Sequence, residues 1–101
     1  MRTRLELSTI LNSIEGPKKV YHQPANNMVL EYPCIIYELD RYDIHFADDS
    51  KYLGKKRYNI EIIDERPSSP IVDEVLKLPF TSFDRTFVND RLYHYVVTLY
   101  F

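Results

Sequence analysis

The chain has 101 residues and a mass of 12.1 kDa, which is enough for one domain with a single hydrophobic core. Hydrophobic residues make up 45% of it and charged residues 28%, which excludes a wholly disordered chain. The formal net charge of −2 disfavours free nucleic acid as the main partner, because dedicated nucleic-acid binders are usually basic.

Several further classes are excluded by what the sequence lacks. The longest apolar run, residues 34–37, is far shorter than the ~18 residues of a membrane span, so we expect no membrane partner. No apolar run follows Arg2 and Arg4, so no secretory signal is predicted. Cys34 is the only cysteine, so an intrachain disulfide cannot form. Two glycines are too few for phosphate-binding loops.

The first predicted element is a helix over residues 4–15. Thr3 and Glu6 have the spacing of a capping box, in which a hydroxyl and a carboxylate bond the free backbone amides of the first turn. Apolar residues follow at helical spacing, namely Leu7, Ile10, Leu11 and Ile14. Gly16 and Pro17 end the helix, because glycine favours the C-terminal cap and proline cannot continue a helix.

A hairpin with a long tip is predicted next. Residues 16–27 form a connecting loop, and residues 28–39 form a strand whose two faces are both partly apolar, as in a strand covered on two sides. Pro33 cannot donate to a ladder, so the early part of this strand is placed at an edge or a bulge. Residues 40–54 are polar and are expected to be a long loop. Apolar and polar residues alternate strictly over residues 56–62, which predicts a half-buried strand.

The second half of the chain starts with a short predicted helix over residues 70–78. Ser69 is its N-cap and Pro70 occupies its first position. The apolar stripe of this helix consists of Ile71, Val75 and Leu78.

Two more strands, residues 80–88 and 92–101, are joined by a turn signal at Asn89 and Asp90. In the last strand one parity is wholly apolar, and its members are Tyr93, Tyr95, Val97, Leu99 and Phe101. That face is expected to be continuous core. The strand reaches the last residue, so we expect it to have no tail to shield it.

These elements predict a single α+β domain over residues 1–101. Its antiparallel sheet has about four strands, two helices pack on one face, and the order is α-β-β-α-β-β. No site for chemistry is visible. Single histidines lie in three different elements, at positions 22, 45 and 94, and do not group as metal ligands. Cys34 lies within a strand, where a small buried residue is expected rather than a nucleophile. We therefore predict no cofactor, no metal and no enzymatic activity.

Two adjacent blocks of opposite charge span the predicted long loop. Residues 38–49 contain five acids against one arginine, and residues 51–57 contain four bases and no acid. The blocks either pair within the hairpin or meet the opposite block of a neighbouring subunit in a head-to-tail ring. The candidate subunit-interface residues are Asp48, Asp49, Lys51, Lys55, Lys56, Arg57, Tyr100 and Phe101.

A family resemblance is carried by short motifs and their order along residues 3–101. The motifs are Tyr32-Pro33-Cys34-Ile35-Ile36-Tyr37, Phe46-Ala47-Asp48, Lys56-Arg57-Tyr58, Phe83-Asp84-Arg85, and Leu92-Tyr93-His94 through Thr98-Leu99-Tyr100-Phe101. Together they resemble the small tail completion, or tail terminator, proteins of tailed bacteriophages.

The resemblance implies a structural virion protein of the tail or neck, assembled in the host cytoplasm and without catalytic residues. Such proteins form a ring, expected to be a hexamer, at the head-proximal end of the tail tube. The implied partners are further copies of the chain, the tail tube protein and the head-tail connector protein, with DNA only as passing cargo. Two alternatives stay open: another neck component, such as a head completion or stopper protein, and a small α+β protein-binding module of unrelated role.

Overall fold

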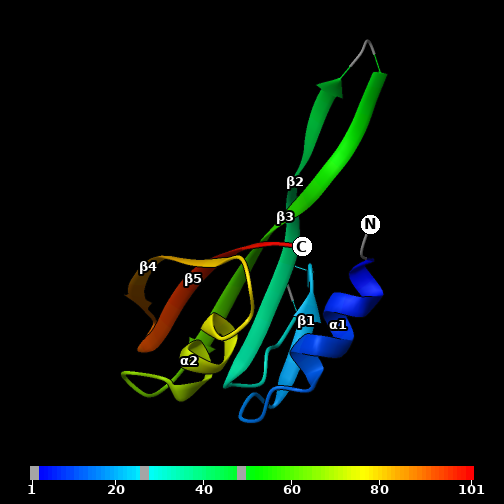
Figure 1. Cartoon of the computed structure of the whole chain (residues 1–101). Helices are drawn as coiled ribbons and strands as arrows, with labels where there is room; N and C mark the ends of the chain where they lie inside the picture. The colour runs from blue at the N-terminus through cyan, green and yellow to red at the C-terminus, as the bar shows by residue number, and fades with distance from the viewer. Residues whose placement is uncertain (1–2, 26–27, 48–49) are drawn as a thin grey trace.

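The computed structural model describes residues 3–25, 28–47 and 50–101, and for residues 43–47 and 50–55 it describes the backbone alone. Seven elements follow one another: α1 (Arg4–Asn12), β1 (Lys19–His22), β2 (Cys34–Ala47), β3 (Ser50–Asp64), α2 (Pro70–Leu76), β4 (Thr81–Asn89) and β5 (Leu92–Tyr100) (Figure 1). This confirms an α+β fold with two helices.

The sheet is mixed and five-stranded, with the order β1-β2-β3-β5-β4, so the prediction of about four antiparallel strands was wrong in detail. β1 pairs with β2 in parallel, whereas the other neighbouring pairs are antiparallel. β1 lies inside residues 16–27, which were predicted to be a loop. Four residues between Pro17 and Pro24 are too few to show a strand period, so the flanking prolines dominated the prediction.

The predicted long loop over residues 40–54 is a second correction. β2 continues to Ala47 and β3 starts at Ser50, so the two strands form one long hairpin whose described residues are almost all extended. Its outer part, residues 40–47 and 50–56, projects from the rest of the molecule and is called the arm below (Figure 1). Tyr42, Ile44 and Phe46 alternate with Asp43 and His45 in this segment, a strand pattern that the prediction of a polar loop did not take into account.

Both helices pack on one face of the sheet, as predicted. The apolar stripes of α1 and α2 contribute buried Leu7, Leu11, Ile71 and Val75. The sheet contributes buried side chains of alternating parity, namely Ile35, Tyr37, Tyr58, Ile60, Ile62, Tyr95, Val97, Leu99 and Phe101. The predicted core face of the last strand is therefore confirmed, with Tyr93 partly buried at its margin.

The predicted helix starts are confirmed by their caps. The hydroxyl of Thr3 accepts a hydrogen bond from the Glu6 amide at 3.3 Å, and the hydroxyl of Ser69 accepts one from the Ile71 amide at 3.3 Å. Both helices end two or three residues earlier than expected. The turn between β4 and β5 lies at Asp90 and Arg91, one residue later than predicted, and both have φ near +50 to +63°.

The position of the last strand in the sheet differs from the expectation of an unshielded strand. β5 lies between β3 and β4, so the edge strands of the described sheet are β1 and β4. The strand predicted to start at residue 28 starts only at Cys34, and it is internal from there, since residues 34–37 pair with β1 on one side and β3 on the other. Pro33 lies just before the strand, where it needs no ladder donor, and its carbonyl accepts a hydrogen bond from the Lys18 amide at 2.7 Å.

Candidate interaction surface: the open sheet face and the arm

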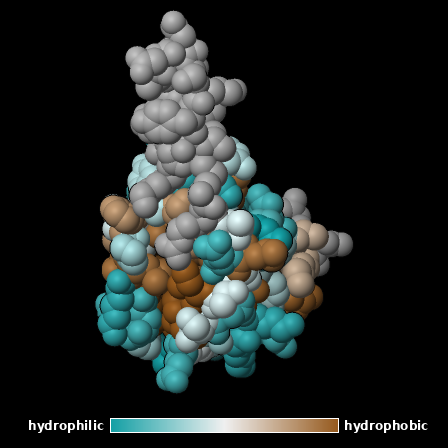
Figure 2. Space-filling view, turned by 45° about the vertical axis from the view of Figure 1, so that its right-hand side comes forward, coloured by the Kyte–Doolittle hydropathy of each residue, from teal (hydrophilic) through white to brown (hydrophobic). Residues whose placement is uncertain are grey.

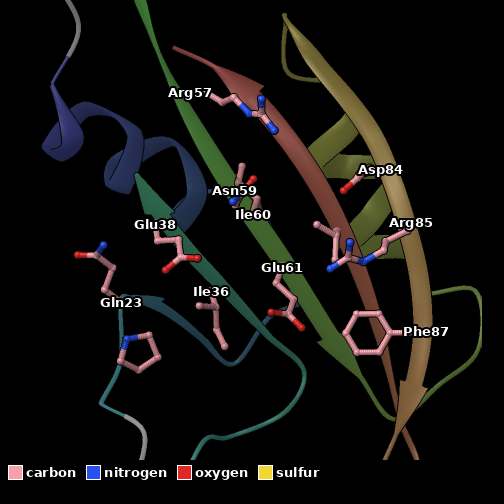
Figure 3. A pocket seen from close by; sticks show the side chains of 12 residues that line it. Gln23, Ile36, Glu38, Arg57, Asn59, Ile60, Glu61, Asp84, Arg85 and Phe87 are labelled. Carbon is pink, nitrogen blue, oxygen red and sulfur yellow. The ribbon is translucent and has the colours of Figure 1, made fainter. Parts of the chain in front are cut away.

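The sheet face turned away from the helices carries mostly polar side chains from four strands. We call it the open face, and its members are Ile36, Glu38, Arg57, Asn59, Glu61, Asp84, Arg85, Phe87, His94 and Val96. Most of them line a broad depression of about 510 Å³, which Gln23 and Pro24 border where the chain leaves β1 (Figure 3). The depression is shallow and polar, which fits a macromolecular contact better than an enclosed small-molecule site.

A row of interacting side chains crosses the open face from β4 to β3. The guanidinium of Arg85 lies 5.9 Å from the ring centroid of Phe87. The Phe87 ring stacks on the His94 ring at 4.6 Å with an interplanar angle of 9°. Nδ1 of His94 lies 2.6 Å from Oε1 of Glu61. The row fixes side chains of three strands in place, so this part of the face is preorganised.

A second polar contact lies near the base of the arm. Nε of Arg57 lies 3.0 Å from Oδ2 of Asp40, which is an ion-pair distance. The Nε–H group is buried and forms no well-aligned hydrogen bond with any described group, so the contact is primarily electrostatic. Arg57 is thereby neutralised by an acid on the neighbouring strand, which is the pairing within the hairpin that the charge blocks left open.

The open face retains unneutralised acidic groups. Glu38 and Asp84 are exposed, and neither forms an ion pair with a side chain that the structure describes. Two basic residues line the depression, Arg57 and Arg85, and of these two only Arg85 forms no ion pair among the described residues. The face is therefore weakly acidic on balance, with Glu38 on the β2 side.

One end of this sheet face is closed by a small apolar cluster. Tyr21, Cys34 and Ile63 are buried there, beneath partly buried Leu30 and Tyr32. The prediction of a strand covered on both sides is thus confirmed only near Cys34. Burial, with a smaller effect from the charge of Glu61, raises the pKa of the Cys34 thiol to about 12. The thiol is therefore protonated at neutral pH, and the prediction of a buried structural cysteine is confirmed.

Among the described residues, the contacts that join the arm to the body lie at its base. β1 pairs with β2 no further than Tyr37, and β5 pairs with β3 from Arg57 onward. At the base, the backbone of Lys56 exchanges two hydrogen bonds with that of Phe101, at 3.1 and 2.8 Å. The Lys56 ammonium also lies 6.0 Å from the centroid of the exposed Tyr42 ring. Further out, β2 and β3 pair with each other.

The predicted interface residues fall into three groups. Asp48 and Asp49 lie outside the described residues, as do the side chains of Lys51 and Lys55. Lys56 and Arg57 lie at the base of the arm, and Tyr100 is half-buried beside them at the end of β5.

Phe101 is different, because its side chain belongs to the core of its own protomer. It is 6% exposed, and its ring packs edge-on against Tyr58 at 6.4 Å. A role for the remaining residues in subunit contacts stays a prediction.

Exposed apolar side chains on and near β4 were missed by the sequence analysis. The strand is an edge, and nearly all its side chains are exposed, including Phe83, Phe87 and Val88. Phe80, just before it, is 62% exposed. A bulge between Phe83 and Arg85 breaks the alternation that would have indicated which side chains face solvent. Figure 2 shows the molecule turned by 45°, with hydrophobic residues exposed between hydrophilic ones on the described part of the body.

No helix in the described part of the chain is long and apolar enough to cross a membrane. Among the described residues, no three histidine, cysteine or carboxylate side chains lie close enough together to hold a metal ion. No protein-family model and no curated protein sequence matches the chain.

Proposed function

We propose that the protein is a non-enzymatic structural subunit of a phage tail. In this proposal several copies form a ring at the head-proximal end of the tail tube, stop its growth and join the tail to the head connector. The resemblance along residues 3–101 supports the proposal, and the α+β fold with two helices is compatible with it.

The observation that carries the proposal is the arm. A two-stranded ribbon without further strands or a covering layer is at best marginally stable in water. Each strand of the arm has about eight residues, so the arm extends about 25 Å beyond the point where β5 stops pairing with β3. We expect such a ribbon to be stabilised by packing against a partner. In a ring, the neighbouring subunit is that partner for every copy.

The distribution of interaction surfaces supports a head-to-tail arrangement. The arm leaves the sheet at one end, whereas the exposed apolar edge strand β4 lies along one side. A contact between two different surfaces repeats from copy to copy and closes into a ring when the rotation allows it. A two-fold contact would instead require one surface to be complementary to itself.

The deciding experiment is electron microscopy of lysates from a phage that lacks this gene, with a complemented lysate as control. We expect filled heads beside unjoined, abnormally long tails. Free tails of normal length beside leaking heads would place the protein on the head side of the neck. Intact infectious virions would overturn the structural role and leave the unrelated binding module.

The charge blocks provide a second test on the purified protein. Lys55→Glu combined with Lys56→Glu should weaken self-association and its dependence on salt, because both charges leave the basic block. Lys18→Glu combined with Lys19→Glu is a matched control, since it reverses an adjacent exposed pair at the sheet end remote from the arm. Equal association of both variants and the wild type would exclude the basic block from the interface.

A further inference from the structure

We propose that the arm of one copy lies on the open face of the next copy, with its basic β3 strand toward the exposed acids of that face, Glu38 and Asp84. The inference rests on the proposed ring and identifies the two surfaces that meet in it.

The arm cannot cover the open face of its own chain. It is the direct continuation of β2 and β3, and these strands themselves form the centre of that face. Extended strands lead the arm away from the body, as Figure 1 shows. An open face covered by an arm must therefore receive it from a different copy, which makes the contact head-to-tail.

The open face offers the kind of surface that such a ribbon requires. Ile36, Val96 and Phe87 supply apolar area, and the row from Arg85 to Glu61 holds its side chains in fixed positions. A polar rim surrounds this apolar area, as is typical of protein interfaces. Such a rim keeps the face hydrated while the subunit is free. A ribbon laid across it would gain a second layer, which no described part of its own protomer supplies to the arm.

The charges of the two surfaces are complementary. On the face, Glu38 and Asp84 lack an ion-pair partner among the described side chains. On the arm, the β3 strand carries Lys56, and its sequence adds Lys51 and Lys55 without any acid. Like charges at such a contact oppose association, and opposite charges set its register.

A charge-swap mixing experiment tests this pairing. The arm variant is Lys55→Glu with Lys56→Glu, and the face variant is Glu38→Lys with Asp84→Lys. The matched controls are Lys18→Glu with Lys19→Glu, and Glu15→Lys with Glu65→Lys, all at exposed positions away from both surfaces. Circular dichroism establishes that each variant is folded, and light scattering after size-exclusion chromatography gives the mass of each sample and of the 1:1 mixtures.

We expect each variant alone to associate at least about tenfold more weakly than the wild type, because acidic arms meet acidic faces or basic arms meet basic faces. The 1:1 mixture of the two variants should recover the wild-type mass with both chains in equal number. A single chain that carries all four substitutions should also recover it. The controls should behave as the wild type does.

Two results would overturn the inference while leaving the ring intact. One is a wild-type mass for either variant alone, and the other is a mixture that stays dissociated although the wild type assembles. If the wild type itself stays monomeric at all concentrations and its gene proves dispensable for virions, the proposed function and the inference fail together.

Discussion

Asp64 connects the end of β3 to the start of α2, and its replacement by alanine tests this connection. The carboxylate is 1% exposed. It accepts hydrogen bonds from the Ser69 hydroxyl at 2.7 Å and from the Arg66 amide, Nε and Nη2 at 3.0, 3.2 and 2.9 Å. Ser69 in turn caps α2 through the Ile71 amide. Asp64→Ala therefore removes the acceptor that orients the cap.

The expected cost of Asp64→Ala is about 3 kcal/mol of unfolding free energy. The buried hydrogen bond from Ser69 to a charged acceptor contributes about 1.5–3 kcal/mol, and the Arg66 amide loses its partner as well. Ser69→Ala should cost about 1–2 kcal/mol, since it removes the cap and one donor to Asp64. The Arg66 side chain is more than half exposed, so solvent screens its ion pair and Arg66→Ala should cost clearly less than Ser69→Ala.

Urea unfolding followed by circular dichroism and tyrosine fluorescence measures these differences, with Glu65→Ala as the neighbouring exposed control. The loss of unfolding free energy should be largest for Asp64→Ala, smaller for Ser69→Ala and smallest for Arg66→Ala. A cost below about 1 kcal/mol for Asp64→Ala would show that the buried cap network is not what stabilises this junction. A cost for Arg66→Ala equal to that of Asp64→Ala would assign the stabilisation to the exposed ion pair instead.

Three further predictions follow from single residues. Burial alone would raise the pKa of Asp64, but hydrogen bonds from Arg66 and Ser69 outweigh it and hold the pKa below 3.8, so the folded state binds this proton less readily than the unfolded state. The unfolding free energy of the wild type should therefore exceed that of Asp64→Asn by a constant amount above pH 5 or so, and this difference should shrink as the pH falls below 3.8. A difference that is unchanged down to pH 2 or so would contradict the lowered pKa. Phe101→Ala should cost about 3–4 kcal/mol in urea unfolding, because the ring fills the core beside Tyr58, and Phe101→Leu should cost less than half of that. Cys34 should react with a thiol reagent only as fast as the protein opens, since the side chain is fully buried and burial also raises its pKa to about 12. Reaction at the rate of a free thiol in the folded protein would refute its burial.

The elements that pack against a layer could be predicted from the sequence. The stripe of α1 and the alternation in β5 were visible because each side chain on one face meets the same core. The caps at Thr3 and Ser69 could also be recognised, because capping is a local interaction over two or three residues. These features explain why the two-layer arrangement was correct.

The elements that were missed have no such layer or are too short. β1 has four residues and is held by parallel pairing with β2, a contact between segments about fifteen residues apart. In the arm, Tyr42, Ile44 and Phe46 alternate with Asp43 and His45, but the many charged residues around them outweighed this short pattern in the prediction of a loop. The order of the strands likewise depends on long-range pairing, which put β5 inside the sheet rather than at its edge.

The predicted interface residues have different surroundings in the fold. Phe101 was predicted at the interface because it is an aromatic residue at the end of the last strand. Hydrophobicity predicts that a side chain is buried, but it does not tell whether the same chain or a partner buries it. Lys56 and Arg57 were selected for charge, and charge is retained at positions where solvent or a partner compensates it. Arg57 is already compensated by Asp40 within the hairpin. Lys56 contacts an exposed aromatic ring and lies on a strand with further lysines, so an acidic neighbour would reduce the repulsion among these charges.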